Sequence, residues 1–362
     1  MTAATPRTGN GDPAAGGGAT RGLPRLCLAG PMVGRTPGYV TTQGEILSDH
    51  LASEGYAVIS TSTVLNRYFR LADIVQTLIR NRGRFDILLV QTFSGASFVV
   101  ADVASWIGRR LGCRVLFHLH GGALPAYMAR FPRWYRRVFD RADAMVAPSH
   151  YLAREIGKHG YRVRVIANSL DLADYTFRVR RSVSPRLFWM RSFHPLYNPG
   201  LAIRVLARLR RDGIDATLVM AGGDKGERPA TEELARTLGV SASVRFAGFL
   251  SMAGKAKEGD AADIFINTND VDNMPVAVVE ACAMGLPVVS TAVGGIPDLL
   301  ADGETGLLVP AGDEERMAGA VRRLLGEPAL AERLSSAGRW LAERSSWQEV
   351  RKEWDTLLAE LR

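Results

Sequence analysis

The chain has 362 residues, which is more than one hydrophobic core usually supports, so two domains are expected. Apolar residues make up 47% of the sequence and charged residues 23%, a composition that indicates a globular protein. The net charge of +8 favours an anionic ligand, an anionic membrane surface or nucleic acid as a partner.

The first 24 residues are rich in Gly, Ala, Thr and Pro and lack an apolar stretch, so we expect a disordered tail (1–24) and no secretory signal. No run of about 18 apolar residues occurs, so no transmembrane helix is expected. Cys27, Cys113 and Cys282 lie far apart in apolar surroundings. This spacing indicates core thiols in a reducing compartment, with neither disulfides nor a metal site. A cytoplasmic location is the resulting expectation.

Strand-like and helix-like segments alternate through the first half of the chain. The apolar runs predict strands at 26–29, 56–60, 86–91, 114–120, 144–147 and 162–166, and helices at 44–53 and 98–111. Ser149 is placed to cap a further helix. The loop after the first strand contains Gly30 and Gly34, where the backbone could approach a ligand closely.

Residues 171–185 have no clear period and many arginines, so they are expected to link two domains. The alternation then restarts, with strands predicted at 187–190, 216–221, 244–247, 264–267, 287–290 and 307–309. Helices are predicted at 199–211, 232–238, 276–284 and 314–325. From residue 328 onward nearly all of the chain is expected to be helical, and it ends in the amphipathic segment 347–361. Two such series predict two α/β domains with parallel sheets and a ligand site in the cleft between them.

The stretch from Asp272 to Pro287, DNMPVAVVEACAMGLP, predicts a helix that is apolar on every side except at Glu280. Pro275 suits the first turn of this helix, where its missing N–H leaves nothing unpaired. Glu280 would lie about 7–8 Å further along the axis, and a buried carboxylate is costly unless something pairs with it or binds it. Because helix N-termini favour anions, the stretch predicts an anion at the helix mouth and a hydroxyl-rich ligand between Asp272 and Glu280.

In its wider frame, IFINTNDVDNMPVAVVEACAMGLPVVSTAVGGIPDLLADGETGLLVP, this stretch closely resembles the donor-binding signature of the family-four glycosyltransferases, which are retaining enzymes of the GT-B fold. In that signature an acidic residue is followed, after seven residues, by Glu. Here the pair is Asp272 and Glu280, with Asp where the family usually has Glu. Weaker similarities at FHLHGG, VIANSLDLADYTF and VRFAGFL extend the resemblance over most of the chain.

The resemblance implies two Rossmann-like parallel-sheet domains that face each other across a cleft. The implied parts are an N-terminal acceptor-binding domain at 25–178, a C-terminal nucleotide-sugar donor-binding domain at 179–340, and a C-terminal helix at 341–362 that packs back on the first domain. The implied activity is a retaining, metal-independent transfer of a sugar from a nucleotide diphosphate sugar to a hydroxyl acceptor, which could be a glycan, a glycolipid or a small molecule. No cofactor and no metal are expected. A nucleotide-sugar epimerase and a weakly active nucleotide-sugar-binding scaffold of the same fold stay open as alternatives.

The resemblance also implies roles for individual residues on the donor side. Glu280 would hold the ribose of the nucleotide sugar, and Asp272 would hold hydroxyls of the donor sugar. The backbone amides around the helix mouth would assist Asp272, and this segment comprises Asn273, Met274, Pro275 and Val276.

Arg191 resembles the arginine of the family that neutralises the leaving diphosphate, where charge builds up as the glycosidic bond breaks. The family usually has a lysine shortly after that arginine, whereas this chain has Tyr197 and Asn198 at that place. Lys225, in the loop after a later strand, is a possible substitute. On the first domain, His120 would line the cleft near the reacting sugar. The loop after the first strand would approach the phosphates closely because it contains two glycines, Gly30 and Gly34.

Each of these residues also has a purely structural interpretation. Asp272 alone could cap a helix, Glu280 could form a buried ion pair with an arginine, and Lys225 could be a solvated loop charge. His118 and His120 are expected to face opposite sides of their strand, with one of them in the core.

The segment Tyr127–Arg141, YMARFPRWYRRVFDR, places aromatic residues at helical spacing beside a face of four arginines. Pro132 is expected to start the regular helix. A basic face beside aromatics is typical of attachment to anionic lipid headgroups, but an ordinary packed helix with a solvated arginine face fits equally well. Nucleic acid is disfavoured as a partner, because no stacking platform or recognised nucleic-acid motif accompanies the charge.

Overall fold

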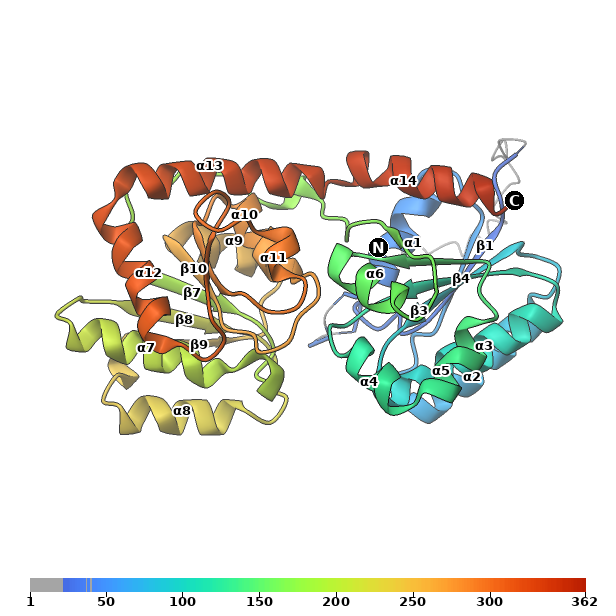
Figure 1. Cartoon of the computed structure of the whole chain (residues 1–362), viewed down its shortest axis with the longest axis horizontal. Helices are drawn as coiled ribbons and strands as arrows, with labels where there is room; N and C mark the ends of the chain where they lie inside the picture. The colour runs from blue at the N-terminus through green and yellow to red at the C-terminus, as the bar shows by residue number, and fades with distance from the viewer. Residues whose placement is uncertain (1–21, 37, 40) are drawn as a thin grey trace, which may run out of the picture.

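The computed structural model describes residues 22–36, 38–39 and 41–362, and it contains two parallel sheets of six strands each. Figure 1 shows the two sheets side by side, each covered by helices on both faces, with the chain crossing between them near the top of the view. The expected tail at residues 1–24 lies outside the described residues except for its last three.

The first sheet has the strand order β2-β1-β3-β4-β5-β6. Its strands are β1 (Leu26–Ala29), β2 (Val58–Thr61), β3 (Ile87–Thr92), β4 (Arg114–Leu119), β5 (Ala144–Ala147) and β6 (Arg164–Val165). The helices around it are α1 (Gln43–Ser53), α2 (Arg67–Arg80), α3 (Phe98–Arg110), α4 (Leu124–Arg130), α5 (Pro132–Phe139) and α6 (His150–Gly157). As expected, Ser149 caps α6, because its hydroxyl accepts from the backbone N–H of Leu152.

The second sheet has the strand order β12-β11-β10-β7-β8-β9. Its strands are β7 (Arg186–Met190), β8 (Thr217–Ala221), β9 (Val244–Gly248), β10 (Ile264–Asn267), β11 (Val288–Thr291) and β12 (Leu307–Val309). Its helices are α7 (Pro199–Arg211), α8 (Arg228–Thr237), α9 (Met252–Ala261), α10 (Val276–Ala283), α11 (Ile296–Leu299), α12 (Glu314–Gly326) and α13 (Pro328–Arg344). The expected class, two parallel-sheet α/β domains, is confirmed.

Helices α2 and α9 are absent from the expected elements. Helix α9, MAGKAKEGDA, buries Gly259 and no other residue fully, so its sequence lacks the apolar stripe that marks a helix. Helix α2 exposes several apolar residues as well as burying Ile74 and Leu78, and this blurs the pattern of a single buried face.

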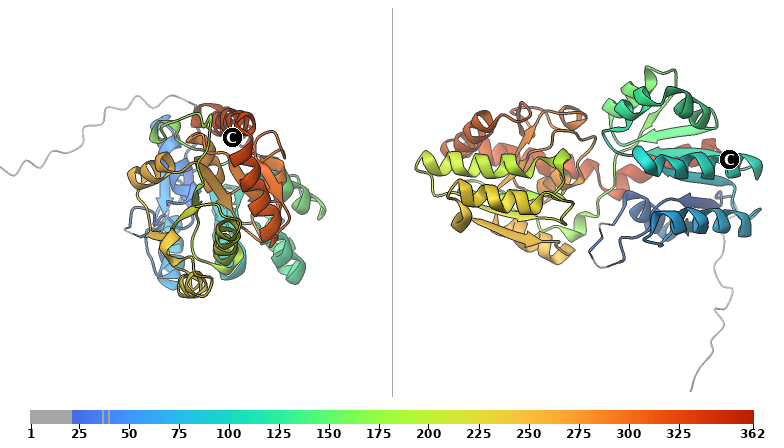
Figure 2. Two further views of the ribbon diagram at one scale, coloured as in Figure 1. Left: turned by 90° about the vertical axis from the view of Figure 1, so that its left-hand side faces the viewer. Right: turned by 90° about the horizontal axis from the view of Figure 1, so that it is seen from below.

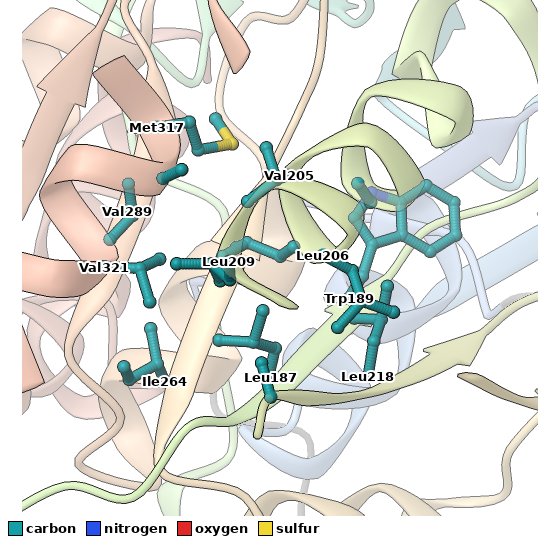
Figure 3. Packing of buried hydrophobic residues seen from close by; sticks show 14 of the residues in the cluster. Leu187, Trp189, Val205, Leu206, Leu209, Leu218, Ile264, Val289, Met317 and Val321 are labelled. Atoms are coloured by element: carbon teal, nitrogen blue, oxygen red, sulfur yellow. The ribbon is translucent and has the colours of Figure 1, made fainter. Parts of the chain in front are cut away.

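Both faces of each sheet carry a buried apolar cluster. On one face of the second sheet, α7 and α12 pack Val205, Leu209 and Val321 against the strand residues Leu187 and Ile264 (Figure 3). Parallel strands buried in this way are apolar along most of their length, which is why the inner strands of this sheet could be predicted from short apolar runs, whereas the edge strand β9 is only partly buried.

The C-terminal helix α14 (Trp347–Glu360) crosses back and packs on the first domain (Figure 1). The ring of Trp347 stacks on His50 of α1 with centroids 4.5 Å apart, and its Nε1 donates to Glu54 Oε1 at 3.0 Å. The hydroxyl of Tyr56 donates to Asp355 Oδ1 at 2.8 Å. The crossing that the fold class implies is therefore present, and α14 belongs to the core of the first domain.

Candidate functional site

Helix α10 begins at Val276, with Pro275 as its N-cap. Pro275 therefore lies just before the first turn, whereas the sequence pattern predicts a place within the first turn. The seven residues after Val276 are buried, Glu280 among them.

No side chain of the described residues caps helix α10. The N–H groups of Val278 and Val279 donate to Pro275 O. Those of Val276 and Ala277 have no hydrogen-bond partner among the described residues. These two N–H groups are therefore available to a ligand, and their partial positive charge favours an anion.

Glu280 is 5% exposed, and its Oε1 accepts two hydrogen bonds. One hydrogen bond comes from Lys255 Nζ of α9 at 2.6 Å. The other comes at 2.8 Å from the hydroxyl of Tyr175, a residue on the crossing between the domains. The alternative of a buried ion pair with an arginine is thus wrong about the partner, which is a lysine. Oε2 accepts no hydrogen bond from the described residues, so it is the atom that can serve a ligand.

Asp272 pairs with Arg191, which follows β7, and both side chains are largely buried. The carboxylate also accepts from Asn269 Nδ2 at 2.5 Å and from the backbone N–H of Asn273 at 2.7 Å. Because the side chain does not reach the first turn of α10, the alternative of a helix-capping carboxylate is wrong. The second domain therefore brings Arg191 and Asp272 together beside the mouth of the helix.

Tyr197, at the place of the expected lysine, stacks on Arg191 with the guanidinium carbon 4.0 Å from the ring centroid. This cation–π contact attracts the guanidinium to the ring. The Nε of Arg191 is buried and has no hydrogen-bond partner among the described residues. Lys225 lies on the neighbouring loop, where its backbone N–H donates to Phe193 O at 2.9 Å, and its side chain is exposed.

Glycines let the loop around Asp272 sit close to both domains. A Cβ on Gly294, whose φ is +54°, would come within 1.9 Å of Asp272 O. A Cβ on Gly122, in the first domain after β4, would come within 2.6 Å of the carbonyl carbon of Asp272. The hydroxyl of Ser149, also in the first domain, hydrogen-bonds Asn273 Oδ1. The mouth of α10 is therefore a contact point between the domains.

His118 and His120 lie on the same side of the first sheet, with ring centroids 4.1 Å apart, so the expectation of opposite faces is wrong. The reason is that side chains two residues apart on a strand share a face. His120 Nε2 hydrogen-bonds Gln91 Oε1 at 2.5 Å, and the ring stacks on Phe93 at 4.9 Å. Burial lowers the pKa of His120 to about 3, so its imidazole is neutral near pH 7.

Gly30 and Gly34 are both explained by packing within the first domain. A Cβ on Gly30 would meet Gln91 Cβ at 2.6 Å. A Cβ on Gly34 would meet Thr41 Cα at 2.2 Å, and its N–H already donates to Glu45 Oε1 at 2.7 Å. A phosphate contact at this loop stays a prediction.

The segment Tyr127–Arg141 divides into α4 and α5 on either side of Phe131. Trp134 packs against the core and donates to Asp102 Oδ2 at 2.7 Å, and Val138 is fully buried. Arg137 and Arg141 pair with the same aspartate. Most of the aromatic side of this segment therefore serves the core, as the packed-helix alternative expects.

Lys255 and Tyr175 are the functional candidates that sequence reasoning missed. Lys255 lies in a segment without a motif, and Tyr175 lies in the segment VIANSLDLADYTF, whose similarity to the family implied no role for it; the two residues are 80 positions apart in the sequence. The single signal for them was the unpaired carboxylate at Glu280, which required some buried donor. Within residues 22–36, 38–39 and 41–362, no group of three or more His, Cys, Asp and Glu side chains could hold a metal ion, and no helix is long and apolar enough to span a bilayer.

Two family profiles match the chain. The family described as Glycosyl transferases group 1 matches residues 180–340, and Glycosyltransferase Family 4 matches residues 35–174. Together they cover the second sheet and all strands of the first sheet except β1, with the boundary between them in the interdomain crossing.

Curated relatives match at moderate identity. The D-inositol 3-phosphate glycosyltransferase of Kribbella flavida is 31% identical over 233 residues, covering 59% of this chain and 55% of that protein. The glycogen synthase of Mycobacterium tuberculosis is 28% identical over 236 residues, covering 63% of this chain and 56% of that protein. The chain thus spans about half the length of the curated relatives that it matches.

Solved structures match over nearly the whole chain. Sucrose-phosphate synthase from Thermosynechococcus elongatus superposes with a TM-score of 0.79 at 17% identity, covering 93% of this chain and 99% of that chain. Anabaena HepE, solved with UDP and glucose, gives a TM-score of 0.75 at 18% identity, covering 93% and 100%. At such identities the likeness establishes the fold, which is GT-B.

Proposed function

Because the chain belongs to the group 1 glycosyltransferases, we propose that it moves a sugar from a nucleotide diphosphate sugar to a hydroxyl-bearing acceptor. One observation carries this proposal. Helix α10 presents an uncapped first turn beside Arg191 and Asp272, and the buried Glu280 lies deeper along the same helix. These groups match the three parts of such a donor, which are the diphosphate, the sugar and the ribose.

On the donor side, we assign the ribose hydroxyls to Glu280 Oε2, because Oε1 is already occupied by Lys255 and Tyr175. The diphosphate goes to Arg191 and the first turn of α10, where the charges are complementary. Asp272 takes hydroxyls of the sugar. In the absence of a donor, Arg191 and Asp272 neutralise each other, so donor binding exchanges one ion pair for contacts to phosphate and to sugar.

The remaining predicted residues keep their proposed places. Asn273, Met274, Pro275 and Val276 form the helix mouth at which backbone amides meet the donor. His120 lies on the first domain, where a neutral imidazole held by Gln91 could contact the reacting sugar. Lys225 is exposed and therefore free to move towards a phosphate, and Gly30 and Gly34 shape the facing loop.

We further propose that the transfer retains the configuration of the anomeric carbon and needs no metal ion. The bond between the anomeric carbon and the diphosphate oxygen breaks, and its electron pair stays on the diphosphate. The acceptor oxygen bonds to the anomeric carbon on the same face of the sugar, and the proton of the acceptor hydroxyl passes to the leaving diphosphate. Arg191 and the dipole of α10 would stabilise that developing charge, which is the task that a divalent cation performs in other phosphate-transferring sites. NMR of the product, which distinguishes retention from inversion, and turnover in the presence of a chelator test these two points.

Two alternatives share this site. An epimerase would convert the nucleotide sugar without an acceptor, and a binding scaffold would hold it without turnover. The occupied place of the family lysine, where Tyr197 stacks on Arg191, is the observation that favours the scaffold. Without that lysine, fewer positively charged side chains would face the diphosphate.

Incubation of the purified protein with a panel of nucleotide sugars, with and without an acceptor extract, tests these functions. Acceptor-dependent release of a free nucleoside diphosphate supports transfer, and a changed sugar without acceptor supports epimerisation. Glu280→Gln is expected to lower turnover at least about tenfold, the equivalent of one lost ribose hydrogen bond to a charged group. Glu353→Gln, a substitution at an exposed residue of α14, is the matched control. Binding without turnover, unaffected by Glu280→Gln, contradicts the transferase.

For its location we propose the cytoplasm, with contact to the inner face of a membrane. The support for the compartment is that Cys27, Cys113 and Cys282 are all free and buried. The support for the membrane contact within Tyr127–Arg141 is the exposed pair Arg130 and Arg133. Retention on anionic liposomes at low salt tests the contact.

A further inference from the structure

One side of the first domain exposes apolar side chains in unusual number. Tyr68 and Phe69, in the first turn of α2, are each 70% exposed. Together with them, the segment from residue 65 to residue 131 exposes Leu65, Ile79, Val99, Trp106 and Phe131 to 37–50%. These seven residues are half of the 14 large apolar side chains that are exposed in the described part of the chain, so the apolar surface is concentrated here.

The seven residues belong to one layer of helices and its connecting loops. Helices α2, α3 and α5 lie side by side and bury their inner sides against the first sheet, as the view from below in Figure 2 shows. Side chains exposed on these helices therefore point away from the sheet. On α2, Tyr68, Val75 and Ile79 recur at helical spacing and line an open groove of about 840 Å³. We call this outer side, with the seven exposed residues, the α2–α3–α5 face.

The same part of the chain carries the positive charge of the protein. Residues 67–141 contain 13 arginines, four aspartates, no lysine and no glutamate, a net charge of +9. The whole chain has a net charge of +8, so everything outside this segment is close to neutral. Eight of these arginines are exposed and have no carboxylate partner among the described residues: Arg67, Arg80, Arg82, Arg84, Arg110, Arg130, Arg133 and Arg136.

Arginines and aromatics on this face are paired one to one at three places. The guanidinium carbon lies over the neighbouring ring at 4.8 Å for Arg67 and Tyr68, 5.0 Å for Arg110 and Trp106, and 5.4 Å for Arg130 and Phe131. An aromatic ring with a cation beside it suits the boundary between lipid headgroups and acyl chains, where one part stays wet and the other enters an apolar layer.

We propose that the α2–α3–α5 face docks the protein on an anionic lipid bilayer, with Tyr68 and Phe69 inserted at the level of the headgroups. A net charge of +9 complements anionic lipids, and each arginine near such a surface adds to the attraction. A second copy of the chain is a poor occupant, because a symmetric contact would set +9 against +9. The groove lined by Val75 and Ile79 is mainly apolar, although Gln76 and Arg80 also line it, and this fits acyl chains better than nucleic-acid bases. The inference rests on the membrane contact proposed above for Tyr127–Arg141 and extends it to α2 and α3, and it holds whether or not the chain transfers sugar.

Co-sedimentation of the full chain with vesicles tests the proposal. The protein is expected to bind vesicles of phosphatidylglycerol and phosphatidylcholine at low salt, and not vesicles of phosphatidylcholine alone. The double variant Tyr68→Ser with Phe69→Ser is expected to bind at least about tenfold more weakly, because two aromatic side chains lose their burial in lipid. Replacing Arg80, Arg82 and Arg84 by Gln is expected to weaken binding and to reduce its dependence on salt.

The matched control is the double variant Leu238→Ser with Phe249→Ser, which removes two apolar side chains that are 40% and 42% exposed on the second domain. It is expected to bind like the unmodified protein. Because all four positions are exposed, thermal unfolding should be unchanged, which separates a docking effect from misfolding. Absence of binding to anionic vesicles overturns the proposal, as does equal binding by the Tyr68 and Phe69 variant. Tighter binding to a single-stranded oligonucleotide, or a dimer that the same variant abolishes, overturns it in favour of those partners.

Discussion

Replacing Lys255 by Met should uncover the cost of burying Glu280. Lys255 Nζ lies 2.6 Å from Glu280 Oε1, and the two side chains are 20% and 7% exposed. Removing one partner of a buried ion pair costs about 3–5 kcal/mol, because the other charge is left unpaired in a poorly solvated place. Since Lys255 is partly exposed and Tyr175 keeps its hydrogen bond of 2.8 Å to the same oxygen, we expect the lower end, about 3 kcal/mol.

The pairing itself is tested by a double-mutant cycle. If the loss of stability comes from the unpaired carboxylate of Glu280, the double variant Lys255→Met with Glu280→Gln should be no less stable than Lys255→Met alone. Lys257→Met is the matched control, because Lys257 lies on the same helix and is exposed; we expect a change within about 0.5 kcal/mol.

Urea unfolding followed by circular dichroism measures these free energies, and titration with a nucleoside diphosphate measures the effect on the ligand site. With Glu280 poorly held, we expect binding about tenfold weaker for Lys255→Met, as for the loss of one charge-assisted hydrogen bond. The reasoning is refuted if Lys255→Met unfolds at the same urea concentration as Lys257→Met, or if the two substitutions of the cycle are simply additive.

Three further predictions concern other parts of the molecule. Gly122→Ala places a Cβ against the backbone of Asp272, so we expect lower turnover with unchanged secondary structure; turnover equal to that of the unmodified protein would show that the domains do not meet here. Burial lowers the pKa of His120 from 6.5 to about 3. Between pH 6.5 and pH 3 the imidazole is therefore protonated in the unfolded chain but not in the folded one, so the free energy of unfolding decreases as the pH falls below 6.5. At pH 5 the loss should be about 2 kcal/mol, and urea unfolding of His120→Gln should show a flatter pH dependence; equal slopes contradict this. Arg180, 1% exposed, donates to four backbone carbonyls, so Arg180→Met should cost about 3 kcal/mol in thermal or urea unfolding, whereas Arg181→Met at an exposed position should not; equal stabilities of the two variants would refute the role.

Much of the secondary structure was predictable because local signals decide it. The helix Pro199–Arg211 has both predicted ends, since Asn198 caps it and Pro199 follows. The strand Ile264–Asn267 likewise has its predicted bounds, because a short apolar run in a parallel sheet is apolar on both faces. Local signals failed at α9, whose residues hardly enter the core.

The candidate site was predictable only in part, for a related reason. The motif identified Asp272 and Glu280, and the wider resemblance identified Arg191, by their place in the chain; the ligand roles of these residues stay predictions. Their partners could not be read in the same way. Arg191 and Asp272 are 81 residues apart, and Lys255 and Glu280 meet only because α9 packs beside α10.

The sequence by itself determined the alternation of strands and helices, and through it two parallel-sheet domains and a buried helix with one acidic residue. Periodicity and capping act over a few residues, so they are written locally in the chain. Only the tertiary structure decided that Lys255 and Tyr175 share one oxygen of Glu280, that Gly122 meets Asp272 across the domains, and that the aromatic residues exposed on the first domain are mainly those of α2 and α3. Such contacts depend on how whole elements pack, because residues far apart in sequence become neighbours only when the sheets and the domains are assembled.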